Sequence, residues 1–529
     1  MSDTTRTGAD MVRGTDEGAG VARGLTRRRV LQQAGVALVA SALPGVRVTP
    51  VAAQGSTPAT TAADLPVSDV MTTLSGYMAE ARGRALPDEV VERAKRHILD
   101  AMAAMVSGSE LEPGRRALAF ARAYGGSAVS TVVADRAVCG PIEAATVNGT
   151  MAHADETDDT LAPGPWHPGC NVVPAALALG EQFRVDGAHF VRAVVLGYDV
   201  GSRVAAAIQP GFDGHKLSYG IIGTFGAAAA GACAAGLTEA QMRFVLSYAA
   251  QQASGIESFP RDPDHTEKGF IFGGMPARNG VTAALLVHHG WTAINDVMSG
   301  PHNFITGHGP TADPRLLVER LGERYDVLRA NIKRWTVGFP IHAPLDAVEE
   351  LFKRQPIDPA RIREVVVRYD PGSITDNSAA VDINVQHALA VMLTDRKLTF
   401  RSIHDVARMK DPAVLALKQK VRLEPAPRGA TAANRPPLVQ IVMADGTRLT
   451  QDNVGPGVLG TAANPLSREQ LLGKCRELMS PVLGAQQTER LIARVMAIET
   501  VKDVRELRPL LQAARRSGPP RLSEYPSAG

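Results

Sequence analysis

Cysteine and aromatic residues are scarce in this chain of 529 residues, which has four Cys and only 5% Phe, Trp and Tyr. The Cys show no CxxC spacing, so a zinc or iron–sulfur site built from cysteine is not expected. Outside residues 1–53, basic and acidic residues are equal in number, so nothing in the charge balance suggests a nucleic-acid-binding surface, which needs clustered basic charge. Beyond the N-terminal region, no segment is apolar over the about 20 residues that span a bilayer, so we expect no stable membrane insertion.

Small residues take the place of the missing aromatics and indicate closely packed helices. Ala and Gly dominate from 223 to 236, where a helix must be buried among others. Val91 and Ile98 fall on one helical face, and Thr238 opens a capping box. We therefore predict that residues 65–333 form the first part of a large all-helical domain.

The pattern changes after residue 333. Residues 362–369 are β-branched and strand-like, and two short strand-like runs flank a turn at 444–446. Helical spacing returns with a capping box at Ser467. The predicted fold class is mainly α, with a large all-helical domain and an inserted smaller α+β lid domain. The predicted boundaries are 65–333 and 463–512 for the helical domain, 334–462 for the lid, and 513–529 for a disordered tail.

The N-terminus has the pattern of an export signal. Thr26-Arg-Arg-Arg29 fits the twin-arginine motif, an apolar run follows, and small residues at 51–53 suit cleavage. Residues 1–53 are therefore predicted to be a twin-arginine signal peptide. The mature protein would be periplasmic or extracellular, or cytoplasmic if the leader is not functional.

The stretch 148–170 places two His and four acidic residues between two apolar, helix-like segments. So polar a segment is not expected in the core, and its Pro and Gly residues predict irregular backbone. Such backbone, rich in acids and imidazoles, is typical of ligand-binding and proton-transfer sites. The candidates are His153, Glu156, Asp158, Asp159, Thr160 and His167. Alternatively, Asp158 and Asp159 cap a helix or pair with Arg.

Further candidates lie in three other places. Lys268 and Arg278 flank a Gly-rich run and can receive carboxylates, and a helix starting at Val281 would present its N-terminus to an anion. His342 lies at the predicted domain junction, a favoured place for pockets, and is a candidate general base. His387 lies in the smaller domain. Each has a structural alternative: a single His is more often structural, and Lys268 can be a solvated charge.

Taken in order, these motifs resemble the MmgE/PrpD family, which contains 2-methylcitrate dehydratases and cis-aconitate decarboxylases. The likeness covers most of residues 65–510, and the serial order of the motifs carries it. The motifs are Asn148-Gly149, His153-Ala154, Asp158-Asp159-Thr160, His167-Pro168, Gly223-Thr-Phe-Gly, Gln252-Ala-Ser-Gly, Lys268 and Pro340-Ile-His342.

The resemblance implies a helical domain with an inserted lid, a homodimer, a site in the cleft between the domains, and no metal or organic cofactor. Residues at family active-site positions are Thr160, His167, Lys268 and His342. The chain departs from the family at three positions: Glu156 replaces an Asp, His387 replaces a Tyr, and Leu217 replaces a His whose nearest equivalent is His215.

The predicted chemistry is proton abstraction beside a carboxylate of a small di- or tricarboxylic acid. Lys268, Arg278 and His167 would neutralise the substrate, while Glu156, Asp158, Asp159 and Thr160 complete the binding site. His342 is the predicted base, with His167 or His387 as the acid.

A cofactor-independent, 2-methylcitrate dehydratase-like hydro-lyase is the favoured function. A decarboxylase, an epimerase and an exported carboxylate-binding protein without turnover stay open. A terpenoid enzyme that binds Mg²⁺ through Asp155, Asp158 and Asp159 is disfavoured, because the sequence has no second Asp-rich motif and few aromatics.

Overall fold

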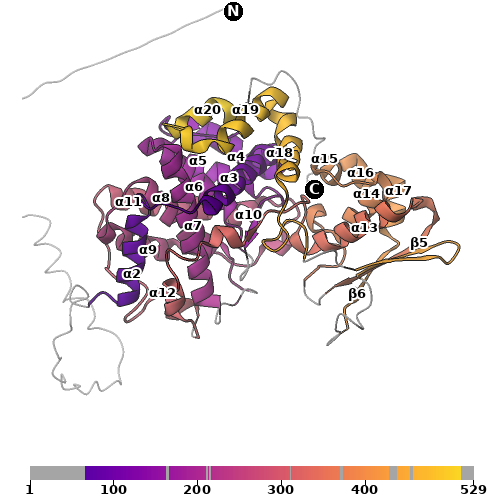
Figure 1. The fold of residues 1–529 in the computed structure, drawn as a ribbon, viewed down its shortest axis with the longest axis horizontal. Helices are drawn as coiled ribbons and strands as arrows, with labels where there is room; N and C mark the ends of the chain where they lie inside the picture. Colours follow the sequence, from indigo (N-terminus) through magenta and orange to yellow (C-terminus); the bar gives the residue numbers. More distant parts are fainter. Residues whose placement is uncertain are drawn as a thin grey trace, which may run out of the picture. The chain divides into compact units, whose positions relative to one another are not determined.

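Helices dominate the computed structural model of the protein (Figure 1). It describes residues 66–161, 166–209, 213, 216–309, 311–369, 373–427, 438–452 and 457–513. The predicted signal peptide, His215 and all of the predicted tail except Ala513 lie outside the described residues. Within the described residues the prediction of a mainly α protein is confirmed.

One large hydrophobic cluster joins helices from the N-terminal and the C-terminal parts of the chain. Its N-terminal helices are α2 (Asp69–Glu80), α3 (Asp88–Gly108), α4 (Glu112–Tyr124), α5 (Pro141–Ala152), α6 (Gly169–Phe183), α7 (Gly187–Ile208), α8 (Gly220–Ala234), α9 (Glu239–Gln252), α11 (Met275–His288) and α12 (Phe304–His308). The short helix α10 (Thr266–Gly269) precedes α11 and contributes no residue to the cluster. The C-terminal helices are α18 (Arg468–Leu483), α19 (Ala485–Met496) and α20 (Arg508–Leu511). Short antiparallel pairs also occur here: β1 (Ser130–Thr131) with β2 (Val138–Cys139), and β3 (Thr160–Leu161) with β4 (Ala330–Asn331).

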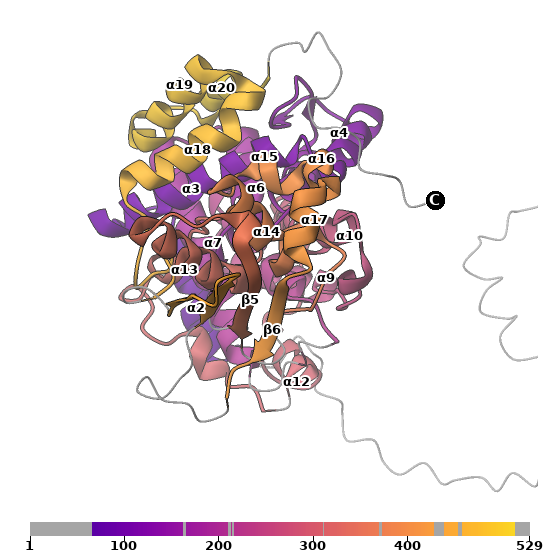
Figure 2. The ribbon, with the colours of Figure 1, turned by 90° about the vertical axis from the view of Figure 1, so that its right-hand side faces the viewer.

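A second hydrophobic cluster lies between Trp335 and Met443 and combines helices with a four-stranded sheet. The helices that contribute to it are α13 (His342–Arg354), α14 (Val385–Asp395), α15 (Phe400–His404) and α17 (Pro412–Lys418). The short helix α16 (Val406–Lys410) lies between α15 and α17 in the chain. The strands β5 (Ile362–Tyr369), β6 (Val421–Pro425), β7 (Val439–Met443) and β8 (Arg448–Gln451) are ordered β6-β5-β7-β8. β5 and β6 run parallel (Figure 2), whereas β5–β7 and β7–β8 are antiparallel. The lid arrangement and its boundaries stay predictions.

Several local predictions are confirmed. β5 has the predicted bounds, and β7 and β8 form the predicted hairpin around a turn in which Gly446 has a φ of +87°. The capping boxes at Thr238 and Ser467 are both formed. Each of these signals depends on residues that are close together in the sequence.

The prediction of a helix that starts at Val281 is wrong. The Gly-rich run is helical throughout: α10 passes through a π-helical turn (Phe270–Gly274) into α11, so Val281 lies in a helix interior. By length and composition the helix 266–288 could cross a membrane, but 72% of its apolar window is buried inside the protein. Burial among other helices is the pattern of a core helix.

Close approach of backbones explains glycine in this region. A Cβ on Gly149 of α5 would lie 2.6 Å from the carbonyl oxygen of Gly273, and a Cβ on Gly273 would lie 2.0 Å from that of Gly149. Both distances are too short for a side chain. The two glycines therefore allow α5 to contact the π-helical turn directly, which brings the segment after α5 close to Lys268.

We predict that Gly149→Ala lowers the free energy of unfolding by about 1–3 kcal/mol, because the added methyl group meets backbone that cannot move freely. Urea unfolding followed by circular dichroism measures the change. Gly76→Ala in α2 is the matched control: its Cβ would meet nothing within 4 Å, so it should be neutral or stabilising by up to about 1 kcal/mol. Equal effects of the two substitutions would contradict the packing argument.

Candidate active site

The polar segment after α5 is buried, contrary to the expectation that it lies outside the core. None of the residues 153–160 is more than 9% exposed, and Trp166 is 1% exposed. The reason is that these polar groups find partners among themselves and on distant elements, which removes most of the cost of burial. The segment therefore forms a charged cluster inside the protein.

Glu156 lies between two ammonium groups. Lys268 of α10 contacts its Oε1, and Nζ of Lys333, which follows β4, donates to Oε2 at 2.8 Å. Burial would raise the pKa of Glu156, but Lys268 and Lys333 hold it well below its usual range. The carboxylate therefore stays charged. The sequence indicated Lys333 only as the start of the junction segment, because its partner is far away in the chain.

Asp158 binds two imidazoles at once. Its carboxylate faces Nδ1 of His153 at 3.0 and 3.1 Å and Nδ1 of His167 at 3.1 Å. Burial would raise the pKa of Asp158, but the two histidines hold it well below its usual range. A charged carboxylate accepts hydrogen bonds only, so each ring carries its proton on Nδ1 and keeps Nε2 for other partners. Among the residues that the structure describes, Asp158 thus neither caps a helix nor pairs with Arg.

Asp159 faces away from this cluster and anchors the segment. It accepts hydrogen bonds from the Tyr198 hydroxyl at 2.6 Å and the Gly169 amide at 2.7 Å, and it lies 2.6 Å from Nδ1 of His97. Gly169 begins α6 two residues after His167, so Asp159 fixes both ends of the loop that carries His167. A positioning role suits this geometry.

Thr160 lies beside the cluster in the two-residue strand β3. It pairs with Asn331 of β4, whose side-chain amide is 3.4 Å from the Thr160 hydroxyl. Lys333 follows Asn331 by two residues, so this strand pair helps to bring Lys333 to Glu156. Thr160 therefore lies near the predicted site residues.

Arg278 lies apart from them on α11. Its guanidinium is 5.4 Å from the centre of the Phe270 ring and donates to the Asn279 side chain. Within the described part of the chain, it pairs with neither Glu156 nor Asp158. The structure therefore does not bring Arg278 to the cluster, because the run that carries it is helical and points it elsewhere.

His342 and His387 are buried at the start of two helices of the second part. His342 begins α13, with Nε2 3.1 Å from the Val337 carbonyl oxygen, and its Nδ1 has no partner among the described residues. Burial and the charge of Lys333 lower its pKa to about 3, so Lys333 links it electrostatically to the cluster. Burial and Lys418 lower the pKa of His387 in α14 to about 4.

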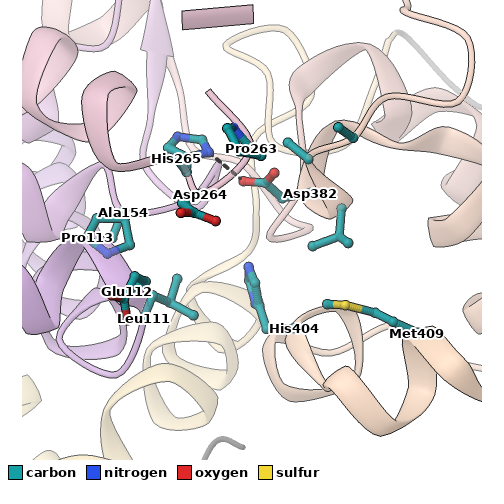
Figure 3. A pocket seen from close by; sticks show the side chains of 13 residues that line it. Leu111, Glu112, Pro113, Ala154, Pro263, Asp264, His265, Asp382, His404 and Met409 are labelled. Atoms are coloured by element: carbon teal, nitrogen blue, oxygen red, sulfur yellow. Dashed lines mark ion pairs between the residues drawn. The ribbon is translucent and has the colours of Figure 1, made fainter. Parts of the chain in front are cut away.

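Two histidine–aspartate pairs connect the first part of the chain to the second. Nδ1 of His265 lies 3.1 Å from Asp382, and Nε2 of His404 lies 3.5 Å from Asp155. They flank a hollow of about 230 Å³, in which Figure 3 shows the first pair and His404 facing each other across the space. Ala154 also lines the hollow. Because Ala154 is the neighbour of His153 in the chain, the hollow lies next to the charged cluster. Sequence reasoning missed His265, His404 and Asp382. A His three residues before Lys268 was the one available signal.

The lowered pKa values of His342 and His387 predict that acid destabilises the fold. On unfolding each returns to an ordinary pKa near 6.5. The unfolded chain therefore binds more protons below that pH, and stability falls as the pH falls towards 4, by up to about 1.4 kcal/mol per pH unit for each group. His387→Gln should therefore make the urea-unfolding free energy less dependent on pH between 7 and 4.5. His289→Gln, at an exposed position, is the control, and equal slopes for both variants would contradict the assignment.

Comparison with known proteins identifies the family of the chain. A model of the MmgE/PrpD N-terminal domain matches residues 72–317, and one of the C-terminal domain matches residues 335–499. The chain is 26% identical to a cis-aconitate decarboxylase of Aspergillus terreus over 471 residues, which cover 82% of this chain and 94% of that protein.

Two mammalian proteins show similar likeness. The cis-aconitate decarboxylase of Homo sapiens is 27% identical over 451 residues, covering 81% of this chain and 91% of its own length. That of Mus musculus is 26% identical over 472 residues, covering 84% and 94%. These relatives support a lyase-type function. Since the two family models together cover well over half of its length, the chain belongs to the MmgE/PrpD family.

Proposed function

We propose that the protein is a lyase that forms a carbanion beside a carboxylate of a small di- or tricarboxylic acid. The observation that carries this proposal is the cluster in which Asp158 orients His153 and His167 next to Lys268 and Lys333. It combines groups that transfer protons with groups that stabilise negative charge, inside a buried region where electrostatic interactions are strong.

Lys268 is the proposed binding group for a substrate carboxylate. An ammonium has three N–H donors, and only one is needed for Glu156, so others remain for a ligand. The aromatic rings of Phe259 and Phe272 lie 5.1 and 5.7 Å from Nζ and limit the directions it can take. Positive charge here would stabilise the extra electron pair that spreads into the substrate carboxylate when the carbanion forms.

His167 is the proposed proton carrier. Asp158 holds its Nδ1, and its side chain is 9% exposed, so its Nε2 is the ring nitrogen available to a substrate. In a decarboxylation, the electrons of the broken C–C bond stay on the carbon, carbon dioxide leaves, and the imidazolium Nε2–H of His167 protonates that carbon. His342 stays the predicted base, close enough to Lys333 to sense its charge.

Decarboxylation of an acid of the cis-aconitate type is the first proposal, because the relatives that span most of the chain are cis-aconitate decarboxylases. Dehydration, as in 2-methylcitrate dehydratases, is the second. It needs a base for the proton and an acid for the leaving hydroxyl, and the site offers more than one imidazole for these roles. We also retain two further proposals: that the protein is exported by the twin-arginine route and that it forms a homodimer.

One experiment separates these reactions. The purified protein is incubated with unsaturated, hydroxy- and amino-substituted di- and tricarboxylic acids in D₂O and followed by NMR. Decarboxylation loses a carboxyl group and adds deuterium at the neighbouring carbon, and dehydration forms an alkene. Epimerisation exchanges deuterium without loss. Binding with neither conversion nor exchange across the panel would contradict the lyase proposal and support a carboxylate-binding protein.

We predict that His167→Gln lowers turnover by about a hundredfold or more, on the scale usual for acid–base groups, while the circular dichroism spectrum is retained. His289→Gln is the matched control, because this exposed residue lies outside the cluster. Steady-state kinetics on the substrate found in the D₂O screen measure the effect. Turnover within twofold of the unsubstituted protein would remove His167 from the mechanism.

His342→Gln is likewise expected to leave folding intact and to reduce turnover by about a hundredfold or more if His342 is the base. Glutamine keeps a side-chain N–H that can donate to the Val337 carbonyl oxygen, so the local hydrogen bond is preserved. Deuterium exchange into the substrate should fall in parallel. Unchanged turnover would show that the buried ring has a structural role.

A further inference from the structure

Three buried side chains converge on one point beside the proposed proton carrier. The donor atoms of His153, Glu156 and His265 all lie within 4.8 Å of one another. His153 directly follows α5, Glu156 lies in the segment after it, and His265 precedes α10. The rings of His153 and His265 are 5.3 Å apart. The proposed lyase mechanism gives no role to His265.

Both imidazoles are oriented as metal ligands are. Nδ1 of His153 faces Asp158 and Nδ1 of His265 faces Asp382, each at a hydrogen-bonding distance. Metal-binding histidines nearly always engage a carboxylate or a carbonyl through the nitrogen that does not bind the metal. Nε2 of each ring is buried and has no hydrogen-bond partner among the described residues. A buried polar atom without a partner destabilises the fold, so a ligand for this pair of nitrogens is expected.

Glu156 keeps the capacity to bind a metal although both lysines contact it. Each carboxylate oxygen has two lone pairs, and each lysine uses one. A second set of donors, His153, Asp158 and Cys170, also lies within 4.8 Å. That set is the weaker one, because Asp158 already binds two imidazoles and burial raises the pKa of the Cys170 thiol well above its usual range.

We propose that His153, His265 and Glu156 form a binding site for a divalent transition-metal ion. Two imidazoles with one carboxylate suit Zn²⁺ and neighbouring ions of the first transition row. Asp158 and Asp382 would orient the two rings. This site goes beyond the proposed function, since the family resemblance implies a reaction without metal.

Zn²⁺ itself is the probe. The full-length protein is purified in the presence of a chelator, dialysed, and titrated with ZnCl₂ by calorimetry in competition with a chromophoric chelator. We expect one Zn²⁺ per chain with a Kd of about 1 µM or lower at pH 7.5. Co²⁺ should give visible absorption bands from nitrogen and oxygen ligands. Absence of binding at 100 µM Zn²⁺ would overturn the proposal.

Variants of the protein then test which residues bind the Zn²⁺ ion. His265 has a φ of +58°, a conformation that Asn tolerates, so His265→Asn is the first variant and should weaken Zn²⁺ binding at least about a hundredfold. Asp382→Asn keeps both imidazoles and should weaken it about 10- to 100-fold through loss of ring orientation. His289→Gln is the control and should bind as the unsubstituted protein does.

Zn²⁺ affinity that is unchanged in His265→Asn would show that the ion is held elsewhere and would overturn the proposal. Thermal unfolding without metal checks that each variant is folded. If His265→Asn does not fold, the Asp382→Asn result decides: unchanged affinity overturns the site, and the stated loss supports it. No substrate is present in these titrations, so their failure leaves the lyase proposal intact.

Discussion

The carboxylate of Asp158 is the group on which the site depends. It is buried, it stays charged, and it receives Nδ1 of both His153 and His167 while Lys333 lies 3.8 Å away. One carboxylate therefore determines which nitrogen carries the proton in both imidazole rings, and it fixes the orientation of both rings. Removing one partner from such a buried ionic group costs about 3–5 kcal/mol, because the remaining charge is left without compensation. These residues consequently form a single unit.

The same region shows how a protein can bury many charged groups and stay folded, because partners offset the free-energy cost of burial. Glu156 is paired with two lysines, and Asp158 is paired with two histidines. Asp159 is bound by Tyr198, His97 and the Gly169 amide. Each carboxylate has partners on at least two separate elements. A charged cluster arranged in this way is rigid, and rigidity is what a site needs when proton transfer requires placement within a few tenths of an ångström.

Packing and chemistry are coupled through small residues. α8 is buried along its entire length and consists mostly of Ala and Gly, and the contact between Gly149 and Gly273 brings α5 against the π-helical turn. Lys268 lies just before that turn and His153 just after α5. The close approach of two backbones therefore determines the distance between an ammonium group and an imidazole.

By itself the sequence determined the mainly α fold class, the strand 362–369, the β7–β8 hairpin, both capping boxes and, through the order of its motifs, the family. These features depend on residues that are neighbours in the chain or on motifs that can be read directly. Only the tertiary structure decided that the polar segment is buried, that the Gly-rich run is helical, that Arg278 lies apart, and that Lys333, His265 and Asp382 join the site. Those outcomes depend on pairs such as Lys333–Glu156 and His265–Asp382, whose members are far apart in the sequence. No local pattern encodes which distant charge will meet a buried carboxylate, because that choice is made by the packing of the helices between them.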